Sequence, residues 1–215
     1  MTPTLSSQNR WIGILFLFYF FGTLGIAIPA LRHLFLPMTP LNLILTLFIF
    51  FKVNKDYSLR FMVLSGIIFG IGYAVEAVGV STGVLFGTYW YGSYFGPKLF
   101  ETPILIGVNW LFLSLSTYGA VQYFIKNKIL LVVLSACLMT GLDFFIEPVA
   151  MELGFWNWAN NHVPMQNFVM WFIVSSTIQI IISVFNPKIN TTVSFAILLA
   201  QFVFFVTLYA CCTKF

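Results

Sequence analysis

Two acidic residues, Asp143 and Glu147, lie near the end of an apolar run that extends from Ile129 to Pro148. Apart from these two acids, the run has the composition of a transmembrane helix, in which an ionised acid costs roughly 2.5–3.5 kcal/mol on insertion scales. A spacing of four residues places both carboxyl groups on one face of a helix. Because the chain contains only six acidic residues, two of them at such positions indicate a site within the membrane.

Paired carboxyl groups in a dry cleft can act as an acid and a base. Burial and a like-charged neighbour favour the protonated form of one member, which can then donate a proton. The alternative is structural: the pair could be a hydrogen-bond clamp, or could reach water at the helix end, which is close to Glu147 because Pro148 follows it. We favour acid–base catalysis, with Asp143 as the proton donor and Glu147 as its partner.

A third acid, Glu76, ends another apolar run. Gly72, Glu76 and Gly79 fall on one helix face, which predicts that a second helix approaches closely beside a buried carboxyl group. No Lys or Arg lies within one turn of Glu76 to explain its position. An interfacial carboxylate in water is the alternative, and we favour a catalytic acid that shares a site with the first two.

Amide and aromatic side chains at a similar depth could complete this site. Asn109 and Asn167 each follow the start of an apolar run and could hold a carboxyl group or a water molecule, or could only link helices, and both interpretations stay open. The loops after Glu76 and after Glu147 are rich in glycine and aromatic residues, which could line a pocket for an apolar substrate. The candidate substrate-binding residues are Tyr73, Thr82, Tyr89, Tyr91, Asn109, Trp110, Trp156, Trp158, Asn167 and Trp171.

The composition predicts an integral membrane protein. Of the 215 residues, 60% are hydrophobic and 7% are charged, whereas a soluble domain carries about 25% charged residues. We expect a single all-α domain, residues 1–215, that forms a polytopic bundle of about seven helices. The predicted spans are Trp11–Leu31, Leu34–Phe51, Phe61–Val80, Pro103–Phe124, Ile129–Met151, Asn167–Phe185 and Thr192–Cys212. The second is the weakest, because Pro37 and Pro40 stand in its first turns.

The basic residues orient this bundle in the cytoplasmic membrane. With a cytoplasmic N-terminus, seven of the ten Lys and Arg residues fall on the cytoplasmic side and three on the other, which is the bias expected of cytoplasmic loops. We therefore attribute the net charge of +4 to orientation, and not to nucleic-acid binding. The three cysteines show no metal-ligand or disulfide pattern, so no metal site is expected.

The motifs around these acids are similar to those of a known family. They are Glu76-x-x-Gly79-Val-x-Thr82-Gly83-x-x-Phe86-Gly87-x-Tyr89-x-Tyr91, Asp143-x-x-x-Glu147-Pro148-Val-Ala, Gly154-x-Trp156-x-Trp158 and Pro164-x-x-Asn167-Phe168-x-x-Trp171. Together they resemble the bacterial and archaeal carotenoid biosynthesis membrane proteins, which include carotenoid hydratases such as the bisanhydrobacterioruberin hydratases. The resemblance covers residues 66–175. The family usually has Asp before the proline, where this chain has Glu147, so a different substrate or product is possible.

The resemblance implies the hydration of a terminal carbon–carbon double bond in an acyclic carotenoid of the lycopene type, without a cofactor. One carboxyl group would protonate the alkene, and another would hold the attacking water. The partners implied are membrane lipid, water and the apolar carotenoid. Three other functions stay open: a lycopene-cyclase-like ring closure that starts with the same protonation, a proton-coupled transporter, and a pigment-binding protein. Transporters usually contain inverted repeats and broken helices, and neither is evident in the sequence.

Overall fold

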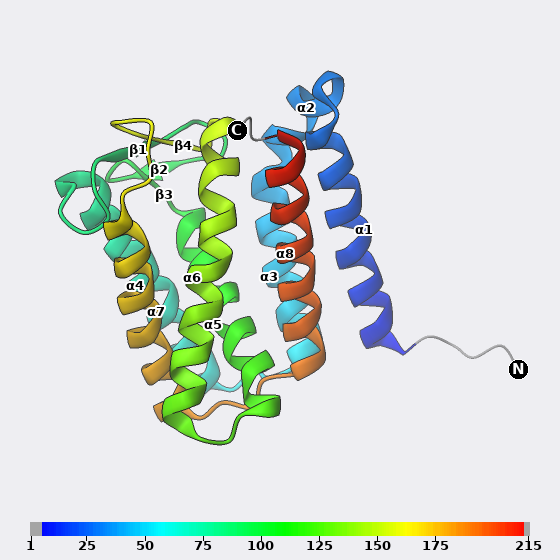
Figure 1. Cartoon of the computed structure of the whole chain (residues 1–215). Helices are drawn as coiled ribbons and strands as arrows, with labels where there is room; N and C mark the ends of the chain where they lie inside the picture. Colours follow the sequence, from blue (N-terminus) through cyan, green and yellow to red (C-terminus); the bar gives the residue numbers. More distant parts are fainter. Residues whose placement is uncertain (1–5, 213–215) are drawn as a thin grey trace, which may run out of the picture.

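A computed structural model gives the fold of residues 6–212, which consists mainly of helices (Figure 1). Seven helices in this part of the chain have 16 residues or more. They are α1 (Ser7–Ala27), α3 (Thr39–Asn54), α4 (Leu59–Thr82), α5 (Leu105–Phe124), α6 (Lys128–Glu152), α7 (Met165–Phe185) and α8 (Thr191–Cys212). The prediction of an all-α bundle of about seven helices is therefore confirmed.

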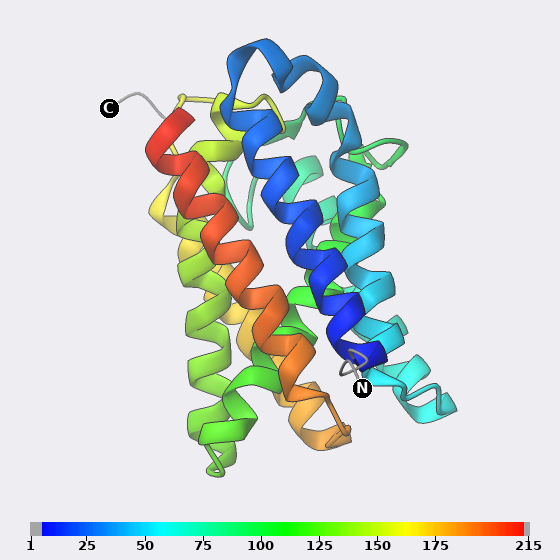
Figure 2. The ribbon, with the colours of Figure 1, turned by 90° about the vertical axis from the view of Figure 1, so that its right-hand side faces the viewer.

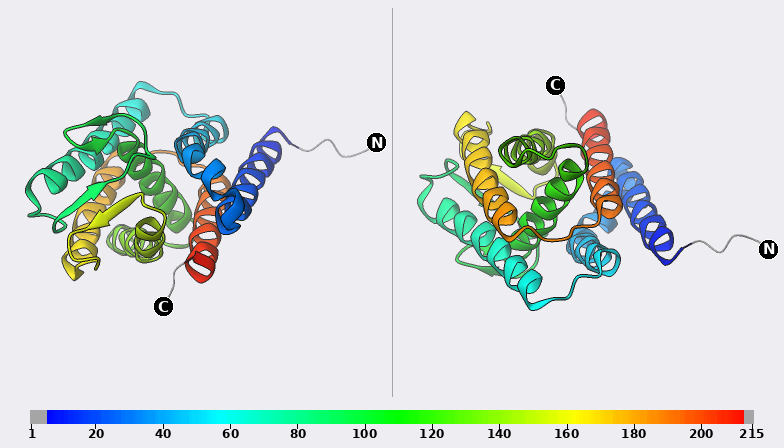
Figure 3. Two further views of the ribbon diagram at one scale, coloured as in Figure 1. Left: turned by 90° about the horizontal axis from the view of Figure 1, so that it is seen from above. Right: turned by 90° about the horizontal axis from the view of Figure 1, so that it is seen from below.

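Six segments of residues 6–212 are long and apolar enough to cross a membrane: α1, the segment Pro29–Asn54, α4, α6, α7 and α8. The remaining long helix, α5, lies inside the bundle and contacts α3, α4, α6, α7 and α8 (Figure 3). Fourteen of its 20 residues are buried. Because α5 packs against protein instead of lipid, it can carry more polar side chains than its neighbours do.

The first predicted span is wrong at its C-terminal end, and the second at its N-terminal end. Helix α1 ends at Ala27, and Pro29 begins a short helix, α2 (Pro29–Phe35), which a 3-10 turn joins to α3. Proline has no backbone N–H and favours the first turn of a helix, so Pro29 begins a new helix instead of continuing α1. The start of α1 and the end of α8 lie at opposite ends of the bundle, because the six segments and α5 together make seven passes along it (Figures 1 and 2).

Two pairs of short antiparallel strands cover one end of α4, α6 and α7 (Figure 1). The first pair joins β1 (Tyr89–Tyr91) to β4 (Trp156–Trp158), and the second joins β2 (Lys98–Leu99) to β3 (Thr102–Pro103). The pair β1–β4 links the loop after α4 to the loop after α6. It therefore lies directly beside the helix ends that carry the predicted acids.

Candidate active site

The β1–β4 pair presents four aromatic hydrogen-bond donors to the bundle. Tyr89 pairs with Trp158 and Tyr91 pairs with Trp156. Alternate residues of a strand point to one face, so these four side chains share the face that is turned toward the helices. Trp90, between the two tyrosines, points away and is 51% exposed. The aromatic residues at alternate positions in these loops are therefore placed by strand pairing.

Two of these donors, together with a third from α5, hydrogen-bond to Glu76 of α4. The hydroxyl groups of Tyr89 and Tyr91 donate to Glu76 Oε2 at 2.6 and 2.7 Å, and Trp110 Nε1 of α5 donates to Oε1 at 3.0 Å. Gly72, one turn earlier on α4, faces Trp110, and a Cβ atom at this position would overlap the tryptophan side chain. The close approach of α4 and α5 that the spacing predicts therefore brings Trp110 within reach of the carboxyl group.

The two tyrosines remain protonated donors. Burial, and then the charge of Glu76, raise the pKa of Tyr89 and of Tyr91 well above the ordinary value for tyrosine. Neither hydroxyl can release its proton near neutral pH. Their role is consequently to hold Glu76 in place and not to act as bases.

Glu147 of α6 is held in a similar way by the other strand. Trp156 Nε1 and Trp158 Nε1 both donate to Glu147 Oε2 at 2.8 Å. Asn167 Nδ2, at the start of α7, donates to Glu147 Oε1 at 3.2 Å and to Asp143 Oδ2 at 2.9 Å. The two acids one turn apart on α6 are therefore joined through a single amide nitrogen. The second oxygen of Asp143, Oδ1, is buried and has no hydrogen-bond partner among the described residues.

The charges of the three acids are not balanced by their hydrogen-bond donors. The donors are two tyrosine hydroxyls, three tryptophan N–H groups and one amide, and none of them carries a positive charge. Uncompensated charges in a buried site repel each other strongly, because little solvent screens them. Asp143 and Glu147 are direct neighbours, since oxygens of both lie within hydrogen-bond distance of Asn167 Nδ2. Two neighbouring carboxyl groups in such surroundings favour a state in which one of them keeps its proton.

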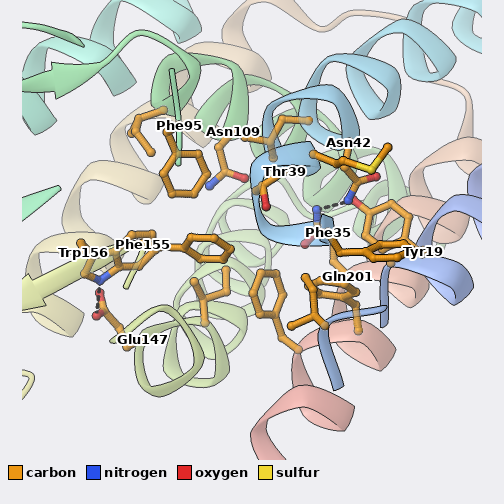
Figure 4. A pocket seen from close by; sticks show the side chains of 18 of the residues that line it. Tyr19, Phe35, Thr39, Asn42, Phe95, Asn109, Glu147, Phe155, Trp156 and Gln201 are labelled. Carbon is orange, nitrogen blue, oxygen red and sulfur yellow. Dashed lines mark hydrogen bonds between the residues drawn. The ribbon is translucent and has the colours of Figure 1, made fainter. Parts of the chain in front are cut away.

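A cavity of about 440 Å³ extends from these acids into the bundle (Figure 4). Glu76, Glu147 and Asn167 line it, whereas Asp143 does not and is fully buried beside Asn167. Most of the remaining wall is apolar or aromatic. Trp110 and Trp171 stack in it with ring centroids 4.2 Å apart. The cavity thus combines an apolar interior with two carboxyl groups at one end.

Eight of the ten predicted substrate-binding residues line this cavity: Tyr89, Tyr91, Asn109, Trp110, Trp156, Trp158, Asn167 and Trp171. The structure places Tyr73 and Thr82 elsewhere. Tyr73 stacks on Phe69 and donates its hydroxyl hydrogen to the Leu99 carbonyl group at the surface. Thr82 is exposed at the end of α4, where its hydroxyl donates to the Val78 carbonyl group. Neither side chain lines the cavity.

No sequence motif indicates the wall of the cavity opposite the acids. Tyr19 of α1, Asn42 of α3 and Gln201 of α8 line this wall (Figure 4). Each is a polar residue inside an apolar run, which is the same signal that identified Asp143. These three residues belong to the first two spans and the last span, where no recognisable motif accompanies them.

Comparisons with known proteins relate the chain to one family. The sequence profile of the family described as "Carotenoid biosynthesis protein" matches residues 16–215. Bisanhydrobacterioruberin hydratase from Haloarcula japonica is 31% identical over 114 residues, which is 48% of this chain and 38% of that protein. The alignment therefore spans well under half of the length of this relative. No solved structure matches the chain.

Proposed function

The chain belongs to the carotenoid biosynthesis protein family, and we propose that it adds water to the terminal carbon–carbon double bond of an acyclic carotenoid, giving a tertiary alcohol. One observation carries this proposal: two carboxyl groups, one of them joined to a third through Asn167, face an apolar cavity within a bundle of membrane helices. The distant relative whose name describes a hydratase supports the same reaction class.

The cavity suits one end of a long hydrocarbon. Its volume of about 440 Å³ is in the range of sites for small molecules, so an end group would fill it while the rest of a polyene extends outside. Leu17 and Phe21 of α1 line the cavity and are each 56% exposed on the outer surface of the bundle. A membrane-dissolved chain could therefore leave the cavity beside α1 and continue into lipid.

We assign the proton transfer to the Asp143–Glu147 pair. The pair donates its proton to the terminal alkene, so that an O–H bond breaks, a C–H bond forms and a tertiary carbocation remains on the adjacent carbon. Glu147 is the member that lines the cavity and can contact the substrate. Asp143, which the sequence favours as the donor, is enclosed and acts through Asn167 and Glu147. In this assignment Asp143 positions and supplies the proton, and Glu147 transfers it.

Glu76 and the aromatic walls would then act on the cation. Glu76 is fixed by three donors, so its charge can stabilise the cation, and a free lone pair on Oε1 can orient a water molecule. The faces of Trp110 and Trp171 add attraction for a positive charge. Water attacks the cation, a C–O bond forms, and the proton that water loses returns to the carboxylate. No oxidation state changes overall, so the proposed reaction needs no cofactor.

Expression in a bacterium that makes lycopene tests this proposal. A hydratase yields pigment whose mass increases by one water for each end that reacts. Lycopene cyclisation would leave the mass unchanged, and a transporter or pigment-binding protein would leave the pigment itself unchanged. A cyclic product of unchanged mass, or an unchanged pigment, would contradict the proposed reaction.

We also propose that the N-terminus is cytoplasmic, as the seven-to-three division of basic residues predicts. The acids and the β1–β4 pair then lie in the outer half of the cytoplasmic membrane. Labelling of single cysteines in the loop between α5 and α6, which carries Lys126, tests this orientation. The loop should be protected from an impermeant reagent in intact cells, and labelling there would reverse the assignment.

A further inference from the structure

A second group of polar side chains lies in the same cavity, at the wall formed by α1, α3 and α8. Gln201 Nε2 donates to the Tyr19 hydroxyl oxygen at 2.7 Å, and that hydroxyl lies 3.1 Å from Thr46 Oγ1. Thr46 donates its own hydrogen to the backbone carbonyl oxygen of Asn42 at 2.8 Å, so Tyr19 is the donor in its contact with Thr46. Tyr19 therefore accepts one hydrogen bond and donates another, and its position in the wall is fixed.

Asn42 is the member of this group with spare hydrogen-bonding capacity. Its side chain lines the cavity with Tyr19 and Gln201, on the side away from Glu147 and Trp156 (Figure 4). Its side-chain oxygen, Oδ1, is buried and has no hydrogen-bond partner among the described residues. A buried acceptor without a partner is costly, and beyond this polar group the cavity is lined mostly by apolar side chains.

A pure hydrocarbon has no hydrogen-bond donor for Asn42 Oδ1. Apolar groups packed against Asn42 would exclude water and leave its side-chain oxygen without a donor. A hydroxyl group can supply that donor, because its O–H can point at Oδ1 while its carbon skeleton contacts the apolar wall. The chemistry that fits is consequently an alcohol at or near the end of a long apolar chain.

We propose that Asn42, which lies beside Tyr19 and Gln201 in the cavity lining, binds a hydroxyl group of the ligand at the far side of the cavity from the acids. The identification of this ligand as a carotenoid end group rests on the proposed function. The hydroxyl group has two possible sources: the tertiary alcohol formed at the acids, which passes this wall on its way to the lipid beside α1, or a substrate that already carries an alcohol.

Binding of two unreactive ligands tests the site without any turnover. The ligands are a long-chain tertiary alcohol and the alkane with the same carbon skeleton, and tryptophan fluorescence of the purified protein in detergent micelles reports binding. The wild type should bind the alcohol about tenfold more tightly than the alkane, the effect of one hydrogen bond between neutral groups. Asn42→Leu keeps the size of the side chain, and it should remove this preference while leaving alkane binding unchanged.

Two further variants control the result. Tyr19→Phe removes the hydroxyl group that holds the wall, and it should reduce the preference for the alcohol in the same direction. Asn54→Leu is the same substitution on α3 at a position outside the cavity, and it should preserve the preference. Equal binding of the two ligands by the wild type, or equal weakening of both by Asn42→Leu, would overturn the inference. Neither ligand contains an alkene, so this outcome is independent of whether the protein hydrates carotenoids.

Turnover then separates the two sources of the hydroxyl group. If the site binds the new alcohol, Asn42→Leu changes steady-state turnover of a hydrocarbon carotenoid but not the rate of a single turnover. If the site binds a substrate alcohol, the same variant raises KM for a hydroxylated carotenoid and leaves KM for the hydrocarbon unchanged.

Discussion

Two polar layers are buried between α5, α6 and α7, and they differ in charge and in their relation to the cavity. The first contains Glu76 of the adjacent helix α4, Asp143, Glu147 and Asn167, with their hydrogen-bond partners. The second is centred on Gln179, which lies 12 residues further along α7, or about 18 Å at 1.5 Å per residue. Gln179 Nε2 donates to the Ser114 carbonyl oxygen at 3.1 Å and to Thr117 Oγ1 at 2.9 Å. We call these residues the acid layer and the glutamine layer.

The difference shows what a charged layer needs that a neutral layer does not. Neighbouring helices supply the partners of Gln179 Nε2, whereas Gln179 Oε1 has no hydrogen-bond partner among residues 6–212. The same holds for the buried hydroxyl groups of Ser116, Ser135 and Ser175 on these three helices. The acid layer instead draws four of its donors from β1 and β4, outside the membrane helices. The acid layer also reaches the cavity, whereas Gln179 does not line it. Buried polar groups form a candidate reaction site only where strong hydrogen-bond donors hold them and a cavity adjoins them.

The largest effect should come from removing the carboxyl group that faces the cavity. Glu147→Gln keeps the shape of the side chain but cannot transfer a proton, so hydration of lycopene should fall at least about 100-fold, the lower range for a lost general acid. Pigment extracted from expressing cells gives the rate, and retained pigment on the purified variant shows that the fold persists. A rate close to that of the wild type would remove Glu147 from the reaction.

Asp143→Asn should have a large but smaller effect, because Asp143 acts through its neighbour. Loss of its charge leaves Glu147 as a single carboxyl group, so turnover should fall about tenfold or more. The pH–rate profile should also lose one ionisation, since the coupled pair no longer titrates. An unchanged profile with a lower rate would indicate a structural role for Asp143.

Loss of one hydrogen-bond donor from the strands should have a moderate effect on turnover, and Trp158→Phe tests this. This variant deletes one of the two N–H donors to Glu147 Oε2, and we expect turnover to fall about tenfold. Trp90→Phe is the matched control on the paired strand, because Trp90 points away from the acids. Equal effects of the two substitutions would mean that the strands matter only for folding.

The glutamine layer should affect stability and not chemistry. Gln179→Leu removes the hydrogen bonds to α5 and should lower the free energy of unfolding by about 1 kcal/mol. Thermal unfolding in detergent measures this change, and the hydration rate should stay at the wild-type value. A variant that unfolds normally but hydrates slowly would show that the two layers are coupled.

The sequence predicts the parts of this molecule that depend on local chemistry. The apolar runs predict α4 to α8, and the four-residue spacing on α6 places Asp143 and Glu147 on one face, as the structure has them. Proline chemistry explains the error at Pro29, where one predicted span became two helices. The sequence cannot pair Tyr89 with Trp158, because that contact joins loops almost 70 residues apart and depends on how four helices pack. Likewise, a helix that is apolar all round does not reveal which face Tyr19 or Gln201 turns to a cavity.

The most direct test of the central claim uses purified protein and lycopene in heavy water. If a carboxyl group of the acid layer protonates the terminal alkene, the product carries one deuterium on the carbon next to the new tertiary alcohol, and Glu147→Gln yields no such product. A cyclic product with no added water, or the same deuterated alcohol formed at an equal rate by Glu147→Gln, would contradict the account.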